Sequence, residues 1–178
     1  MITNKTYDVI SVGDSASMGR TLTKKDIDLF GVLSGDLNPT HFSDAYAEML
    51  LDRQKVVGHS MWGGALISSL LGNDLPGPGT VYKSQHLEFH GALGLEDTVH
   101  VTITVSEKHT EDNRIGFACR AVNQRNEEII TGTAEVRAPT RKATGPGVAA
   151  GDLTYHARNA FRDLIAKVQA SDPISVAV

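Results

Sequence analysis

An uncharged run at residues 58–71, GHSMWGGALISSLL, constrains the fold more than any other part of this chain. Its residues are apolar or small on nearly every side, which is typical of a helix surrounded by protein. Gly63 and Gly64 lower its helix propensity, so a close neighbour is expected to need the space they leave. The sequence therefore predicts a buried helix that the rest of the domain covers.

The segments after this helix change to a period of two, with apolar side chains alternating with polar ones. Four strands are expected, at residues 81–89, 99–105, 115–122 and 130–137. Short polar turns such as HTEDN and NQRNE favour an antiparallel meander over parallel units. A further strand is expected near residues 7–12 or 20–22. A sheet wrapped around one apolar helix is an α+β, hot-dog architecture.

Two short helices are expected before the buried one. Thr23 can cap a helix over residues 23–33, and Asp26 stands where a capping box places its acid. Ser43 can cap a second helix over residues 43–51. The polar stretch GDLNPTH lies between these two helices.

The end of the chain differs in composition from the rest. Residues 1–137 are expected to form the hot-dog domain, and the Pro, Gly, Ala and Thr of residues 138–152 indicate a linker. Residues 153–178 predict an amphipathic helix followed by the apolar run ISVAV. This tail either begins a following domain or packs on its own domain or a dimer partner.

Charge and cysteine content exclude several classes of protein. The net charge of −4 argues against a nucleic-acid surface. The single cysteine, Cys119, rules out an intrachain disulfide and a cysteine metal cage. The amino terminus lacks the pattern of a signal peptide, and no apolar run approaches the roughly 20 residues that span a bilayer. A cytoplasmic protein is expected.

The motif GDLNPTH carries the first candidate chemistry, because Asp36 and His41 flank an Asn-Pro turn. Alone, such a motif is more often turn polarity and helix capping than a catalytic pair. Its position shortly before the apolar helix changes that balance. Free backbone N–H groups at Ser60, Met61 and Trp62 would suit a carbonyl oxygen that gains negative charge. Asp36 and His41 could move protons beside it.

The segment FGVLSGDLNPTHFSDAYA, residues 30–47, resembles the signature of the MaoC-like, (R)-specific enoyl-CoA hydratases (hydratase 2). Residues 56–82 look like the HGM…LLG…LPG.G..Y segment of the same family. The resemblance covers roughly residues 17–137 and implies the hot-dog fold. It implies that Asp36 and His41 form a catalytic dyad, which activates one water. That water adds to a trans-2-enoyl-CoA with a short acyl chain and gives an (R)-3-hydroxyacyl-CoA. The reaction is reversible.

The resemblance also implies roles for the neighbours of this pair. The Ser60 N–H, next to Met61, would bind the thioester oxygen, and Asn38 would support the dyad. Ser68 matches a family serine close to the dyad, although a hydroxyl satisfied within a buried helix explains it equally well. Ser60 itself departs from the family's usual glycine, and Trp62 either limits the acyl tunnel or belongs to the core.

The resemblance implies no metal or redox cofactor, an acyl-CoA substrate, and a homodimer or higher oligomer. Two rival functions stay open, a hot-dog acyl-CoA thioesterase and a non-catalytic acyl-CoA-binding or dimerisation module. His59 either positions the start of the apolar helix or is a buried, hydrogen-bonded histidine.

The tail HARNAFRDLIAKVQASDPISVAV resembles the junction of bifunctional hydratase/phosphate acetyltransferase proteins, which implies a following acyltransferase domain.

Overall fold

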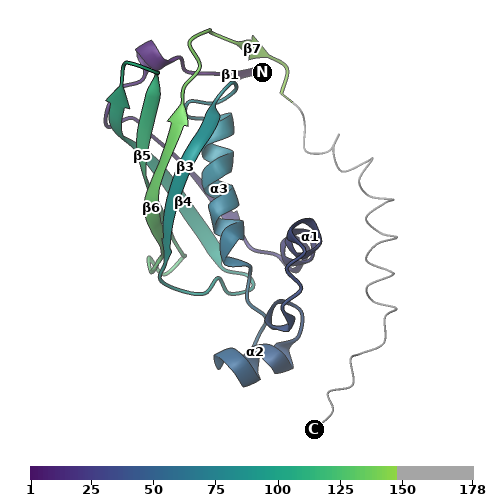
Figure 1. The fold of residues 1–178 in the computed structure, drawn as a ribbon. Coiled ribbons are helices and arrows are strands. Elements are labelled where there is room, and N and C mark those ends of the chain that lie inside the picture. The colour runs from purple at the N-terminus through teal and green to yellow at the C-terminus, as the bar shows by residue number, and fades with distance from the viewer. Residues whose placement is uncertain (148–178) are drawn as a thin grey trace. The chain divides into compact units, whose positions relative to one another are not determined.

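An antiparallel sheet packed against one central helix forms the body of the protein (Figure 1), as the sequence predicts. The computed structural model describes residues 1–147, and residues 2–144 form one compact unit. The five strands are β2 (Ser15–Thr21), β3 (Val81–Phe89), β4 (Thr98–His109), β5 (Arg114–Val122) and β6 (Glu128–Arg137). Their order across the sheet is β2-β4-β5-β6-β3, and every neighbouring pair is antiparallel.

Two details of the sheet differ from the predicted ones. Residues Tyr7–Val9 form the short 3-10 helix η1, so the strand expected at residues 7–12 is wrong, while the alternative at 20–22 overlaps the end of β2. The meander holds only for β4, β5 and β6. β3 pairs with β6 and not with β4, the next strand in the chain. A period of two carries no information about the partner of a strand, which explains the second difference. The first shows that alternation over a few residues does not by itself make a strand.

The apolar run forms α3 (Ser60–Asn73), which lies against the sheet (Figure 1). Only one side of the helix is buried in the domain, because Met61, Ala65 and Ser68 are exposed, so the prediction that it is covered all round is wrong. A Cβ at Gly63 would lie 2.4 Å from the Cδ1 atom of Ile130, so the expected close neighbour is strand β6. Side chains of α3 and the inward side chains of the strands form one buried cluster. Its larger members include Leu66, Ile67, Leu70, Val101, Ile103, Phe117 and Ile130.

Cys119, the one cysteine of the chain, belongs to this same core and is only 3% exposed. Burial raises the pKa of its thiol to about 11, because a thiolate is poorly solvated in apolar surroundings. The thiol is therefore a core side chain and not a nucleophile.

The helices before α3 confirm most of the predicted capping. Helix α1 (Lys24–Ser34) begins with the expected capping box between Thr23 and Asp26. Helix α2 (Asp44–Leu51) follows Ser43, but the side chain of Ser43 makes no capping bond, so that part of the prediction is wrong.

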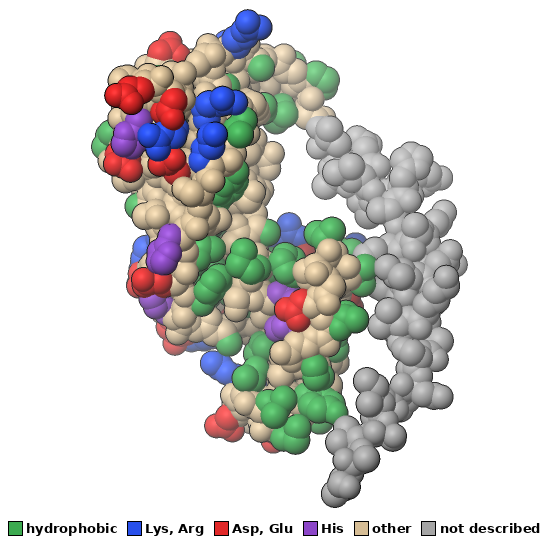
Figure 2. Space-filling view, in the orientation of Figure 1, with side chains coloured by type: hydrophobic (Ala, Val, Ile, Leu, Met, Phe, Trp, Pro, Cys, Tyr) green, Lys and Arg blue, Asp and Glu red, His purple; other side chains and the backbone are tan. Residues whose placement is uncertain are grey.

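Figure 2 shows hydrophobic side chains gathered over α1 and α2. The exposed hydrophobic residues of these two helices include Leu33, Met49, Leu50 and Leu51.

The chain after β6 returns to the amino terminus. Strands β1 (Ile2–Thr3) and β7 (Thr144–Gly145) pair in a small two-stranded sheet. The Asn4 side-chain amide donates to the carbonyl oxygens of Pro78 and Arg141, both at 3.0 Å. The first residues of the expected linker are thus bound to the domain. The predicted helix and domain junction of residues 153–178 lie outside the described residues.

Within residues 1–147, no helix has the length and apolar character needed to cross a membrane.

Gly132 on β6 provides a test of the pairing between β6 and β3. A Cβ at this position would lie 2.0 Å from the carbonyl oxygen of His86 on β3. We expect Gly132→Ala to lower the free energy of unfolding by about 2–4 kcal/mol, because backbone atoms of β3 would have to move. Gly72 on α3 is the matched control, since a Cβ there meets no atom of residues 1–147 within 4 Å. Gly72→Ala should raise stability by about 0.5–1 kcal/mol.

Urea denaturation of both variants measures these changes. An unchanged midpoint for Gly132→Ala would contradict the pairing of β3 with β6 in this register.

Candidate active site

The end of helix α1 places Asp36. Gly35 ends the helix with φ of 74°, a left-handed conformation that favours glycine. The Ser34 hydroxyl donates to the carbonyl oxygen of Phe30 at 2.7 Å and accepts the Asp36 N–H at 3.2 Å. Asp36 Oδ1 in turn accepts the Asn38 N–H at 3.2 Å. These bonds leave Oδ2 free, on a side chain that is 53% exposed.

Asn38 and the proline turn place His41. Asn38 Oδ1 caps the 3-10 helix η2 (Pro39–His41) by accepting the N–H and the hydroxyl of Thr40, at 3.2 and 3.0 Å. His41 Nδ1 lies 2.8 Å from the carbonyl oxygen of Val57. A carbonyl oxygen can only accept, so Nδ1 carries the proton and Nε2 is left as the basic nitrogen.

Asp36 and His41 face each other through these free atoms. Asp36 Oδ2 lies 3.8 Å from His41 Nε2. This distance is too long for a direct hydrogen bond. It suits two groups that share a proton through a small molecule lying between them. The His41 side chain is 12% exposed, which leaves it accessible from one side.

The start of α3 supplies two of the three expected amide donors. Among the described residues, neither the Ser60 nor the Met61 N–H has a protein acceptor. The Trp62 N–H donates to the carbonyl oxygen of His59 at 2.9 Å, so the prediction that it is free is wrong. The first turn folds back on its N-cap residue, which sequence alone does not reveal. The Trp62 side chain is 5% exposed and belongs to the core.

A shallow groove of about 480 Å³ runs between α3 and β3, beside the first turn of the helix. Phe30, Met61, Gly64, Ala65, Ser68, Tyr82, Ser84 and Gln85 line it. Ser68 is exposed there, and its hydroxyl is not enclosed in a buried helix. Tyr82 donates its hydroxyl to Gln85 Oε1 at 2.7 Å, and burial raises the pKa of Tyr82 to about 12. The groove is therefore an uncharged surface with a few hydroxyl groups.

His59 joins the two halves of the candidate pair. Its Nε2 lies 2.9 Å from the backbone carbonyl oxygen of Asp36, and its ring centroid is 3.8 Å from that of His41. Burial, the largest cause, lowers the pKa of His59. The sequence motif gives no sign of these contacts, because His59 lies 23 residues beyond Asp36.

Asp36, His41 and His59 bring ligand-type atoms within 4.8 Å of one another, as a metal site would. The imidazole rings of the two histidines are stacked, with an angle of 31° between their planes. Nitrogen lone pairs lie in the ring plane, so stacked rings direct them side by side instead of toward one point. The cluster therefore fits proton transfer better than metal chelation.

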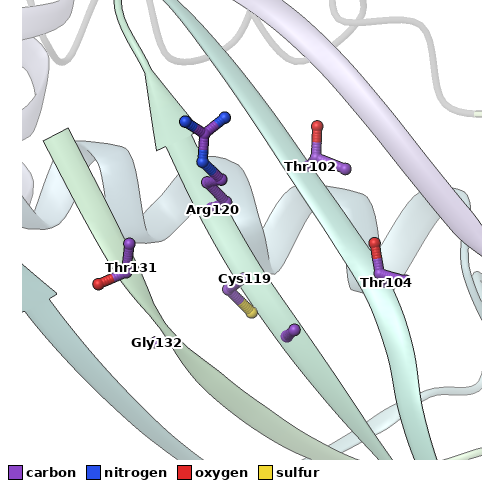
Figure 3. A pocket seen from close by; sticks show the side chains of 7 residues that line it. Thr102, Thr104, Cys119, Arg120, Thr131 and Gly132 are labelled. Carbon is purple, nitrogen blue, oxygen red and sulfur yellow. The ribbon is translucent and has the colours of Figure 1, made fainter. Parts of the chain in front are cut away.

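A second cavity of about 470 Å³ lies on the sheet and is built from β4, β5 and β6, with α3 behind them (Figure 3). Thr102, Thr104, Ala118, Cys119, Arg120, Thr131 and Gly132 line it. Arg120 Nε is bound to Glu128 at 2.8 Å. None of the candidate proton-transfer groups lines this cavity, so the site is assigned to the end of α3.

Comparison of the sequence with known proteins gives the family of this chain. The MaoC like domain family matches residues 12–127, and the chain belongs to it. It is 35% identical over 137 residues to an (R)-specific enoyl-CoA hydratase of Rhodospirillum rubrum, covering 76% of this chain and 92% of that protein.

Two further relatives agree in class. A 3-hydroxybutyryl-CoA dehydratase of Methylorubrum extorquens is 31% identical over 140 residues, covering 79% of this chain and 88% of that protein. Among solved structures, R-hydratase PhaJ1 from Pseudomonas aeruginosa has a TM-score of 0.75 and 35% identity, covering 83% of this chain and 97% of that one. The relatives are thus enzymes named for adding or removing water.

Proposed function

We propose that this chain catalyses the reversible, (R)-specific hydration of trans-2-enoyl-CoA thioesters, with Asp36 and His41 as its catalytic dyad. The observation that carries the proposal is the 3.8 Å separation of Asp36 Oδ2 and His41 Nε2, together with two amides that have no acceptor within residues 1–147. The names of the relatives support the same reaction class. The name of the Methylorubrum relative, which refers to a four-carbon acyl group, supports a short-chain substrate.

In the proposed reaction, one water is held between the two side chains. His41 Nε2 takes one of its protons as the oxygen bonds to C3 of the substrate, and the Asp36 carboxylate stabilises the imidazolium that results. The electrons of the double bond move toward the thioester oxygen, which accepts the Ser60 and Met61 N–H groups. Return of the proton from His41 to C2 completes the addition of one water. No metal or redox cofactor takes part in these steps.

Asn38 and Ser68 are given supporting roles. Asn38 keeps η2 capped and so fixes the distance between the dyad residues. Ser68 offers its hydroxyl to a substrate in the groove between α3 and β3.

Hydration of crotonyl-CoA by the isolated chain tests the proposal. The absorbance of the conjugated thioester should decrease without release of free thiol, and chiral chromatography should find the (R)-3-hydroxy product. Release of thiol, from saturated acyl-CoA as well, would instead identify a thioesterase. Binding of acyl-CoA without turnover would identify a non-catalytic module.

We also propose that two copies pair through strand β3. β3 is an edge strand of the sheet. Its Val81, Tyr82 and Phe89 side chains are 41%, 37% and 43% exposed. Edge strands with apolar side chains are ready to pair with another strand. Sedimentation analysis should give twice the mass of one chain, and a monomer at micromolar concentration would contradict this pairing. A cytoplasmic location and a following acyltransferase domain remain predictions from the sequence.

A further inference from the structure

His59 is a buried histidine that the proposed reaction does not use. It is 2% exposed and occupies the N-cap position of α3 without capping the helix through its side chain. Its Nε2 contacts the backbone carbonyl oxygen of Asp36 at 2.9 Å. Its Nδ1 is buried and has no hydrogen-bond partner among the described residues. A buried polar atom without a hydrogen-bond partner lowers the stability of the folded protein, so a functional reason for this histidine is worth seeking.

The ring of His59 contacts the other half of the dyad. Its centroid is 3.8 Å from that of His41, and the two planes differ by 31°. Phe30 and Phe42 lie on further sides of the same ring, with centroids at 5.2 and 6.0 Å. His59 thus contacts Asp36 through the backbone and His41 through the ring, and two aromatic residues hold it there.

The bonding pattern fixes the protonation of both imidazoles. The acceptor of His59 Nε2 is a carbonyl oxygen, so this nitrogen carries the proton and Nδ1 is bare. His41 has the opposite tautomer, because its Nδ1 donates to Val57. Burial lowers the pKa of His59 and so favours its neutral form. A neutral neighbour leaves His41 free to become positively charged, whereas a charged ring at 3.8 Å would oppose it.

From these contacts we infer that His59 is a positioning residue, which holds the Asp36 backbone through Nε2–H and supports the His41 ring during proton transfer. The inference rests on the proposed function. It assigns His59 no contact with the substrate.

Two substitutions separate the hydrogen bond from the bulk of the ring. His59→Phe keeps an aromatic ring beside His41 but removes the donor to Asp36. His59→Gln places an amide N–H near the position of Nε2 and so restores the donor. We expect kcat of His59→Phe to fall about 10- to 100-fold, because a displaced catalytic group loses rate steeply. Its KM should change by less than about threefold, since binding groups are untouched.

His59→Gln should recover most of the lost kcat, to within about threefold of the parent. Thermal melts of both variants show whether they fold. Equal losses in the two variants, or an effect on KM alone, would overturn the inference. So would full activity in His59→Phe.

A measurement on the unmodified chain covers the case in which His59→Phe does not fold. Nitrogen-15 NMR of the imidazoles at neutral pH should find His59 protonated at Nε2 and His41 at Nδ1. A doubly protonated His59, or one protonated at Nδ1, would overturn the inference. If the parent chain does not hydrate crotonyl-CoA, the proposed function fails, while the tautomer of His59 still decides the geometric part of this inference.

Discussion

Asp36→Asn is expected to lower kcat for crotonyl-CoA hydration about a thousandfold, within the range that general acid–base groups contribute. The amide has nearly the same shape as the carboxylate, and its Oδ1 can still accept the Asn38 N–H. It carries no negative charge, so it cannot stabilise the imidazolium that His41 forms. KM should change little, because the carboxylate acts mainly in the transition state.

Asp52→Asn is the matched control for this change. Asp52 ends α2 with φ of 53°, a conformation that asparagine also adopts readily, and it has no part in the proposed site. This variant should keep the activity of the parent. The double variant of Asp36→Asn with His41→Gln should lose little more than the more damaging single variant, since groups that act as a unit are not additive. Independent, multiplying losses would contradict a shared water.

Ser60→Pro is expected to lower kcat about 100-fold or more, the usual effect of removing one donor to a developing oxyanion. Ser60 is the first residue of α3, and proline is well accepted at that position. His59, which precedes it, has φ of −64° and ψ of 128°, an extended conformation that proline requires of its neighbour. The substitution thus removes one N–H that has no acceptor in the described part of the chain, and it leaves the helix intact.

Ser60→Ala is the control, because it removes the hydroxyl but keeps the N–H. It should lose far less activity than Ser60→Pro, and steady-state kinetics with circular dichroism compares the two at equal helix content. Equal losses would show that the hydroxyl, and not the amide, contributes. Unchanged activity in Ser60→Pro would exclude this N–H as a donor to the thioester oxygen.

Local patterns predicted the elements of this fold well, and pairings between distant elements poorly. The capping box of Thr23 and Asp26 is visible in four neighbouring residues, and it starts α1 as expected. The alternation in residues 99–105 likewise identified β4. The pairing of β3 with β6 depends instead on how the connection after Phe89 crosses the sheet. No residue pattern within β3 reports that crossing.

The same distinction holds at the site. Asp36, Asn38 and His41 lie on six consecutive residues, so their turn chemistry could be interpreted locally. The stack of His59 on His41 arises only when α3 docks beside η2. A helix start has unpaired donors, which predicts a free Trp62 amide, but the tight first turn gives this N–H an acceptor in the carbonyl oxygen of His59.

The buried Cys119 has a practical consequence for experiments on this protein. With its pKa at about 11, only about a thousandth of the thiol is ionised at pH 8. We therefore expect Cys119 to react slowly with thiol-directed dyes, and the sequence contains no other cysteine to remove. A single cysteine introduced at Ser84, in the groove beside α3, would carry a fluorophore at one known place. Its emission could then follow the binding of acyl-CoA in real time.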